Sequence, residues 1–218
     1  MRPRFILASA SPRRRQLLSD AGFEFEIASP RVEEISHGWL TIRELTMWNA
    51  ARKATGAAGV SPDAVVLAAD TLVAIDGEVL GKPADLDDAV RILQRLSGRS
   101  HEVWTGVRIN HPARGRSRSF HEMSRVHFRK LDGRAIRSYL AKIDPLDKAG
   151  SNAAQGHGME IIERIDGQIA VVSPSIARSG LVAGAVEQVA LALRQLVHRI
   201  GDQPPGVLRR GGRRRVGK

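Results

Sequence analysis

The stretch "LAADTLVAIDGEVLGKP", residues 67–83, decides the fold that we expect for this chain. Its apolar start predicts a buried strand that ends at Asp70, and the Asp76-Gly77 pair between two short apolar segments is typical of a β-hairpin turn. Lys82 follows twelve residues after Asp70, just before a proline. The stretch therefore predicts a strand and a hairpin, and it places a carboxylate and a cation where a site could form.

Strand and helix patterns alternate along the first part of the chain, and hairpins are mixed in later. A capping-box pattern, "TIRE", begins one helix at Thr41. The segment "NHPARGRSRSFHEM", residues 110–123, is predicted to be a polar loop between two strands. This order predicts an α/β fold with a mixed twisted sheet and flanking helices. Expected strands include residues 5–8, 23–27, 65–69, 161–165 and 169–172, and expected helices begin at Ser11 and cover residues 41–55, 85–97, 133–143 and 181–200.

The composition is that of an ordinary globular protein. Of 218 residues, 42% are hydrophobic and 26% are charged, which is enough to build one sizeable core. The chain has no cysteine, so disulfides and thiolate chemistry are excluded. No apolar run approaches the roughly 18 residues that a membrane-spanning helix needs. We therefore expect a cytoplasmic protein without a membrane partner.

The net charge of +11 is strongly basic and unevenly distributed. Residues 201–218 hold six basic side chains and one acidic one, and they are rich in Pro and Gly. Such a composition predicts a disordered basic tail that follows a single domain over residues 1–200. A basic tail can contact nucleic acid, but a solvated tail without a partner is the commoner case.

The segment "LASASPRRR", residues 7–15, is the first candidate site. A strand leads into a loop of small residues that opens a helix at Ser11 and Pro12, and free backbone N–H groups there attract anions. Ser9 adds a hydroxyl, and Arg13 and Arg14 add forked donors suited to phosphate. The alternative is a capped helix with solvated arginines.

Asp70 and Thr71 form the second candidate, because ligands of open α/β sheets lie beyond the carboxyl ends of strands. A carboxylate there could hold a metal ion or orient a water, or it could cap a turn. Lys82 could bind phosphate or be a surface lysine. Glu33 and Lys53 are weaker candidates, for which a plain surface role is the default.

A further candidate is the loop "DKAGSNAAQGHG", residues 147–158. It combines an acid, a base, amides and three glycines with little periodicity. Loops of this kind carry function more often than packing.

In series, "LASASPRRRQLL", "AADTLV…GEVLGKP", "LSGRSHEVWTGV" and "DKAGSNAAQG" resemble the motifs of the Maf family over about residues 5–167. These septum-formation-inhibitor-like proteins act as nucleoside triphosphate pyrophosphatases. The resemblance implies an inosine-triphosphatase-like α/β fold with two lobes around a cleft, and a homodimer. It also implies hydrolysis between the α and β phosphates with a divalent metal cation, Mg²⁺ or Mn²⁺.

The resemblance assigns roles by motif. Asp70 matches the family's catalytic acidic residue, and Asp70 and Glu33 are the two carboxylates implied for the metal. The implied phosphate-binding residues are Ser9, Arg13, Arg14, Lys53 and Lys82. From the residues alone, Asp70 could be the general base or the metal ligand, and both roles stay open.

Three residues resemble the dTTP/UTP branch of the family: Arg13, Thr71 and Gln155. The branch that acts on 7-methyl-GTP tends to have an aromatic residue in place of Arg13. The run "SNAAQ" beside Gln155 departs from the family pattern, which leaves CTP and modified pyrimidine nucleotides as further substrates. "AVVSPS", residues 170–175, is a second departure. The alternative function is a basic nucleic-acid-binding or division-regulating protein without catalysis.

Overall fold

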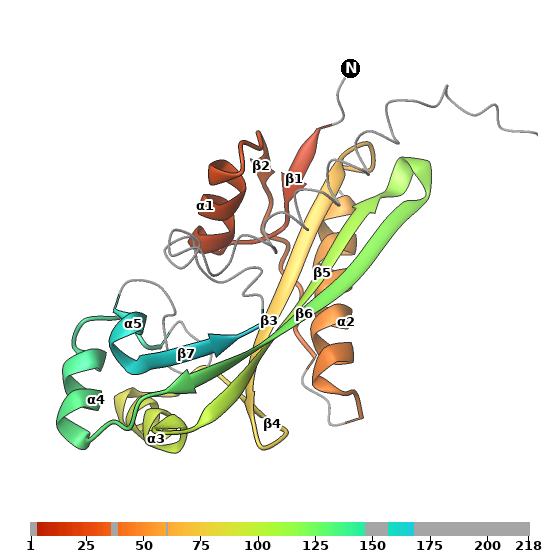
Figure 1. The fold of residues 1–218 in the computed structure, drawn as a ribbon. Helices are drawn as coiled ribbons and strands as arrows, with labels where there is room; N and C mark the ends of the chain where they lie inside the picture. The colour runs from red at the N-terminus through yellow and green to blue at the C-terminus, as the bar shows by residue number, and fades with distance from the viewer. Residues whose placement is uncertain (1–3, 36–38, 60, 147–156, 168–218) are drawn as a thin grey trace, which may run out of the picture.

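The computed structural model describes residues 4–35, 39–59, 61–146 and 157–167 (Figure 1). Several expectations lie outside these residues: the helix over 181–200, the strand over 169–172, Gln155 and the basic tail. None of the helices in the described ranges has the length and apolarity needed to span a lipid bilayer.

The described residues form one mixed sheet, in the order β2-β1-β3-β5-β6-β7 with β4 paired to β3. Strand β1 runs parallel to β2 and β3, and the other pairs are antiparallel. This arrangement confirms the predicted mixed sheet. The strands are β1 (Phe5–Leu7), β2 (Glu26–Ile27), β3 (Val65–Ile75), β4 (Glu78–Leu80), β5 (Ser100–His111), β6 (Arg116–Phe128) and β7 (Ile162–Asp166).

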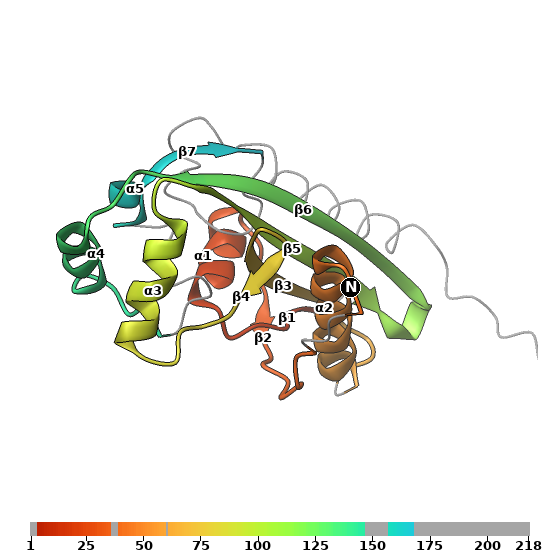
Figure 2. The same cartoon turned by 90° about the horizontal axis from the view of Figure 1, so that it is seen from below.

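Helices flank the sheet, as predicted, and lie near both of its ends (Figures 1 and 2). Helices α3, α4 and α5 gather at one end of the long strands, and β1, β2 and α1 lie at the other. The helices are α1 (Pro12–Asp20), α2 (Ile42–Ala58), α3 (Leu86–Leu96), α4 (Gly133–Leu140) and α5 (Gly158–Ile161), with a 3₁₀ turn at Pro112–Arg114.

Strand β3 runs through two separate hydrophobic regions. In its first half, Val65 and Leu67 pack with Leu18 of α1, whereas the alternate residues Val66 and Ala68 pack with alanines of α2. Helices α1 and α2 therefore cover opposite faces of the sheet. In its second half, β3 joins another core, whose largest members include Leu93, Leu96, Phe128 and Tyr139. These two regions agree with the expected two-lobed molecule.

The prediction that β3 ends at Asp70 is wrong, because the strand continues to Ile75. Its pairing with β5 is unbroken from Val66 to Ala74, so Asp70 lies in mid-strand opposite Gly106. Two polar residues interrupt the apolar run because that part of the strand has polar neighbours on both faces. The hairpin is confirmed, with positive φ angles at Asp76 and Gly77.

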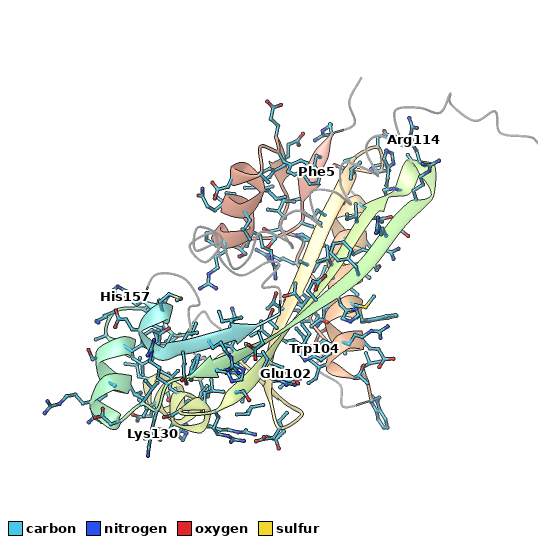
Figure 3. All side chains as sticks on the ribbon, in the orientation of Figure 1. Phe5, Glu102, Trp104, Arg114, Lys130 and His157 are labelled. Carbon is cyan, nitrogen blue, oxygen red and sulfur yellow. The ribbon has the colours of Figure 1, made fainter. Side chains whose placement is uncertain are left out.

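The segment predicted as a polar loop over residues 110–123 is mostly strand. Strands β5 and β6 pair continuously from Ser100↔His127 to His111↔Arg116, and only Pro112–Arg114 and Gly115 turn the chain. The segment escaped prediction because the outer part of this ribbon carries polar side chains. Figure 3 shows the length of the ribbon, with Arg114 at one end of the molecule and Lys130 toward the other.

Helix α2 begins at the predicted capping box. The Thr41 hydroxyl accepts from the Glu44 N–H at 3.3 Å, and Glu44 accepts from the Thr41 N–H at 2.9 Å. The helix does not stop at Gly56 but ends at Ala58 with Gly59 as its cap. A side chain at Gly56 would meet Val32 and Pro30 at about 3 Å, so this glycine serves close packing against the segment before α2.

Candidate active site

Asp70 is a buried carboxylate, 4% exposed, and each of its two oxygens accepts a hydrogen bond from a side chain of α2. Lys53 Nζ donates to its Oδ1 at 2.7 Å, and Asn49 Nδ2 donates to its Oδ2 at 3.2 Å. Asn49 and Lys53 lie four residues apart, so they occupy one face of the helix, one turn from each other. The charge of Asp70 is thereby compensated by an ion pair and a neutral hydrogen bond.

Gly106 explains how α2 comes so close. It lies directly opposite Asp70 in the β3–β5 ladder. A Cβ at Gly106 would lie 2.5 Å from the backbone carbon of Thr46 and 2.6 Å from the Met47 nitrogen. Because glycine has no side chain, the backbone of α2 rests on the sheet here, and Asn49 and Lys53 reach Asp70.

Lys53 also contacts a second carboxylate, Glu34, whose Oε1 lies 2.6 Å from Nζ. Lys53 therefore bridges Glu34 and Asp70. Glu33, the residue expected from the sequence, is exposed, and its side chain makes no hydrogen bond or ion pair within the described residues. Only the Glu34 side chain reaches Lys53, although it is itself 56% exposed. A metal-binding role for Glu33 stays a prediction.

Arg14, Ser9 and Thr71 lie together on the α1 side of β3. Arg14 Nη1 donates to the Ala69 carbonyl at 2.8 Å and to Ser9 Oγ at 3.3 Å, and Nη2 donates to Thr71 Oγ1 at 3.0 Å. Burial lowers the pKa of Arg14, and the negative charges of Asp70 and Glu34 oppose this shift. An arginine stays charged at neutral pH, so the group places a cation beside the strand.

The loop before α1 is organised by Ser9. Its hydroxyl accepts from the Ser11 N–H at 3.2 Å. Ser11 occupies the N-cap position, as predicted, but its own side chain makes no capping hydrogen bond. Ser9 therefore takes part in holding the start of α1, in addition to its contact with Arg14.

Two other predicted cations, Arg13 and Lys82, lie near the start of α1 and beyond β4. Arg13 lies in the first turn of α1 and is partly buried, and Lys82 lies two residues beyond β4 and is exposed. In the described part of the chain, neither is hydrogen-bonded or ion-paired to Asp70. Gln155 lies outside the described residues. Phosphate and base contacts of these three residues stay predictions.

The carboxylates fit a divalent cation only in part. Within the described ranges there is no group of three or more His, Asp or Glu side chains that could hold a metal ion. Asp70 and Glu34 are hard oxygen donors, and Mg²⁺ often binds one or two carboxylates together with substrate phosphates. The donor set therefore suits a cation that arrives with a phosphate ligand. Lys53 lies between the two carboxylates, so it would have to move.

Sequence reasoning missed four residues of this site: Asn49, Glu34, Thr105 and Gly106. Thr105 Oγ1 lies 3.0 Å from Thr71 Oγ1. Asn49 could have been found, because it lies one helical turn from Lys53 on a predicted helix. The two residues of β5 could not, since their closeness to Asp70 depends on strand register.

Comparisons with known proteins find one family and several curated relatives. The family described as Maf-like protein matches residues 4–173. The protein named dTTP/UTP pyrophosphatase of Pelotomaculum thermopropionicum is 43% identical over 74% of this chain and 85% of its own length. Proteins with the same name from Bdellovibrio bacteriovorus and Bacillus pumilus are 43% and 42% identical, over 77% and 80% of this chain and 90% and 92% of their own lengths.

The fold and the site define a class: an α/β protein whose mixed sheet carries a buried aspartate, paired with a lysine, in the middle of a strand. The matched residues include every described part of that site. The chain belongs to the Maf family.

Proposed function

We propose that this chain is a nucleoside triphosphate pyrophosphatase that hydrolyses dTTP and UTP to the monophosphate and pyrophosphate. The observation that carries the proposal is that two polar groups flank adjacent residues of β3 from its two faces. Lys53 pairs with Asp70 on the α2 side, and Arg14 joins Ser9 and Thr71 on the α1 side. All five were candidates from the motifs of a family whose curated members here are named dTTP/UTP pyrophosphatase.

Substrate binding follows from charge. A nucleoside triphosphate carries about four negative charges, so its site needs cations and backbone donors. Lys53, Arg13 and Lys82 supply cations, and the N-terminus of α1 supplies N–H groups. Arg14 belongs to the same phosphate-binding set, because its three protein contacts leave two of the five N–H donors of a guanidinium for a phosphate. It also orients Ser9 and Thr71.

Selectivity for the base rests on Arg13, Thr71 and Gln155, as the motif match implies. Of the three, Thr71 has a hydroxyl that accepts from Arg14 Nη2 and lies 3.0 Å from Thr105 Oγ1, so its position is fixed. CTP and modified pyrimidine nucleotides remain candidate substrates beside dTTP and UTP.

Asp70 is the reacting carboxylate in this proposal. It either accepts the proton of the attacking water or holds the metal. Lys53 and Asn49 occupy two of the roughly four acceptor sites of the carboxylate, and release of Oδ1 from Lys53 would free a third. The phosphates of an incoming nucleotide attract Lys53 and so favour this release. A bound Mg²⁺ or Mn²⁺ would polarise a phosphate oxygen. The ion would be held by Asp70 and by Glu33 or Glu34, and Glu34 is the one that shares Lys53 with Asp70.

The cellular location and the oligomeric state are further parts of the proposal. We place the protein in the cytoplasm, which is consistent with the absence of cysteine. A homodimer is expected from the family resemblance, and size-exclusion chromatography with light scattering would measure it. The high positive charge keeps one alternative open, a nucleic-acid-binding protein without catalysis.

The test is a pyrophosphate-release assay of purified protein with Mg²⁺ against dTTP, UTP, CTP, 7-methyl-GTP and modified pyrimidine triphosphates. We expect selective release from dTTP and UTP. Release from none of them, with Mn²⁺ also tried on folded protein, would reject the proposal and favour the binding protein. Release only from 7-methyl-GTP would retain the reaction and reject the roles of Arg13, Thr71 and Gln155.

A further inference from the structure

Helix α2 places a second side chain against Asp70 that belongs to none of the motifs, Asn49. It is 2% exposed. Its Nδ2 donates to Asp70 Oδ2 at 3.2 Å and to the Ile35 carbonyl at 3.2 Å, and its Oδ1 accepts from the Ile35 N–H at 3.0 Å. One buried amide thus joins the strand carboxylate to the segment that precedes α2.

The pattern of partners fixes the orientation of the Asn49 amide. Both hydrogens of Nδ2 are used, and Oδ1 has a donor of its own. Rotating the amide by 180° would set its oxygen against the Asp70 carboxylate and the Ile35 carbonyl, and its nitrogen against the Ile35 N–H. All three contacts would become repulsive, so only one orientation is satisfied.

The consequence reaches Glu34. This residue precedes Ile35, and its carboxylate contacts Lys53. By bonding both backbone groups of Ile35, Asn49 holds the backbone that follows Glu34, and by bonding Oδ2 it restrains the rotation of Asp70 about its side-chain bonds. Oδ1 is thereby left directed at Lys53. Asn49 thus controls the arrangement of both carboxylates without touching a substrate.

We infer that Asn49 is a positioning residue, which holds Asp70 and the Glu34 segment in the mutual arrangement that the reaction needs. The inference rests on the proposed pyrophosphatase function. Because Asn49 contacts the reacting carboxylate and not the phosphate-binding cations, its loss affects turnover and leaves nucleotide affinity almost unchanged. Misplacement of a reacting group by about 1 Å costs up to about 100-fold in rate.

Two substitutions separate the contacts of Asn49. Asn49→Leu has a similar volume and removes all three hydrogen bonds. Asn49→Asp keeps an oxygen for the Ile35 N–H but sets its second oxygen against both Asp70 and the Ile35 carbonyl. Asn110→Leu is the matched control, because Asn110 is partly buried on β5 opposite Val66, away from Asp70. Steady-state kinetics with dTTP and Mg²⁺ are corrected for the folded fraction of each variant.

We expect Asn49→Leu to lower kcat by about 30-fold or more and to change KM by less than about three-fold. Asn49→Asp should lose at least as much kcat, although it keeps the bond to Ile35. Amide hydrogen exchange at Ile35 should accelerate in Asn49→Leu and stay slow in Asn49→Asp. Asn110→Leu should match the wild type in all three readouts.

A near-wild-type kcat in Asn49→Leu, or a loss confined to KM, would overturn the inference while the wild type still hydrolyses dTTP. If Asn49→Leu does not fold, the kcat of Asn49→Asp decides in the same way. A wild type that releases no pyrophosphate would instead reject the proposed function, and the inference with it.

Discussion

At the scale of single residues, the chain places charges where burial makes them costly and then compensates them. A buried carboxylate without a partner destabilises a fold by several kcal/mol, and Asp70 avoids this through Lys53 and Asn49. If Asp70 is replaced by asparagine, Lys53 still has Glu34 as its partner. Such a variant is therefore expected to fold, which makes it a clean probe of the chemistry.

His101 is a buried titratable residue outside this site. It is 2% exposed, neither ring nitrogen has a hydrogen-bond partner among the described residues, and its ring packs edge-on against Phe128. Burial lowers the pKa of His101 from 6.5 to about 4. The unfolded chain therefore binds a proton at a higher pH than the native protein does.

This difference predicts a loss of stability in acid. The contribution of neutral His101 to the free energy of unfolding is fully present above about pH 6.5 and is lost as the pH falls toward 4. The total loss is about 3 kcal/mol. Urea unfolding at pH 7.5 and pH 5 measures it. The wild type should lose about 2 kcal/mol more than His101→Phe between these values. Equal losses of stability in the two proteins would show that His101 binds its proton as readily in the native protein as in the unfolded chain, which would contradict the lowered pKa.

At the scale of elements, α2 is the helix on which the site depends. Its capping box fixes where the helix begins, and Gly106 lets it rest on the sheet. The register of the β3–β5 ladder then sets Asp70 opposite that point of contact. Small changes at the start of α2 should therefore affect stability before they affect chemistry.

The two helix starts allow a matched comparison. Thr41→Ala removes a side-chain cap that accepts from the Glu44 N–H, so it should lower the free energy of unfolding by about 1 kcal/mol. Ser11→Ala changes an N-cap residue whose side chain makes no capping bond, so its cost should be close to zero. Denaturant unfolding at pH 7.5 compares them. Equal costs would contradict the capping geometry.

Local signals in the sequence were enough to predict part of this architecture. The Asp76-Gly77 turn and the Thr41 capping box depend on neighbouring residues, and both are confirmed. The continuation of β3 through Asp70 could not be predicted, because pairing with β5 overrides the polar interruption. The choice between Glu33 and Glu34 could not be made either, since the direction of each side chain depends on how the segment packs on α2.

At the scale of the whole molecule, three long strands join two hydrophobic regions. The ladder of β3, β5 and β6 is continuous through both, and Asp70 and Thr71 lie between the residues of β3 that enter one region and those that enter the other. The candidate site is thus held by backbone pairing that belongs to both halves, which suits a site that must stay rigid.

The basic segment over residues 201–218 is proposed to lie outside the catalytic domain over residues 1–200. Its removal takes away six basic residues and one acidic residue. We expect a chain truncated after residue 200 to hydrolyse dTTP within about two-fold of the full chain and to leave a DNA column at lower salt. Lost hydrolysis would contradict the proposed domain boundary, and unchanged retention would place the polyanion contact elsewhere.

Hydrolysis between the α and β phosphates should depend on Asp70, and product analysis of dTTP turnover measures this dependence. Wild type and Asp70→Asn are incubated with dTTP and Mg²⁺, the products are separated by ion exchange, and Tm is recorded for both proteins. We expect thymidine monophosphate and pyrophosphate from the wild type, and a rate lower by at least about 100-fold in Asp70→Asn at a similar Tm. Full activity in Asp70→Asn, or thymidine diphosphate with free phosphate as the products, would contradict this expectation.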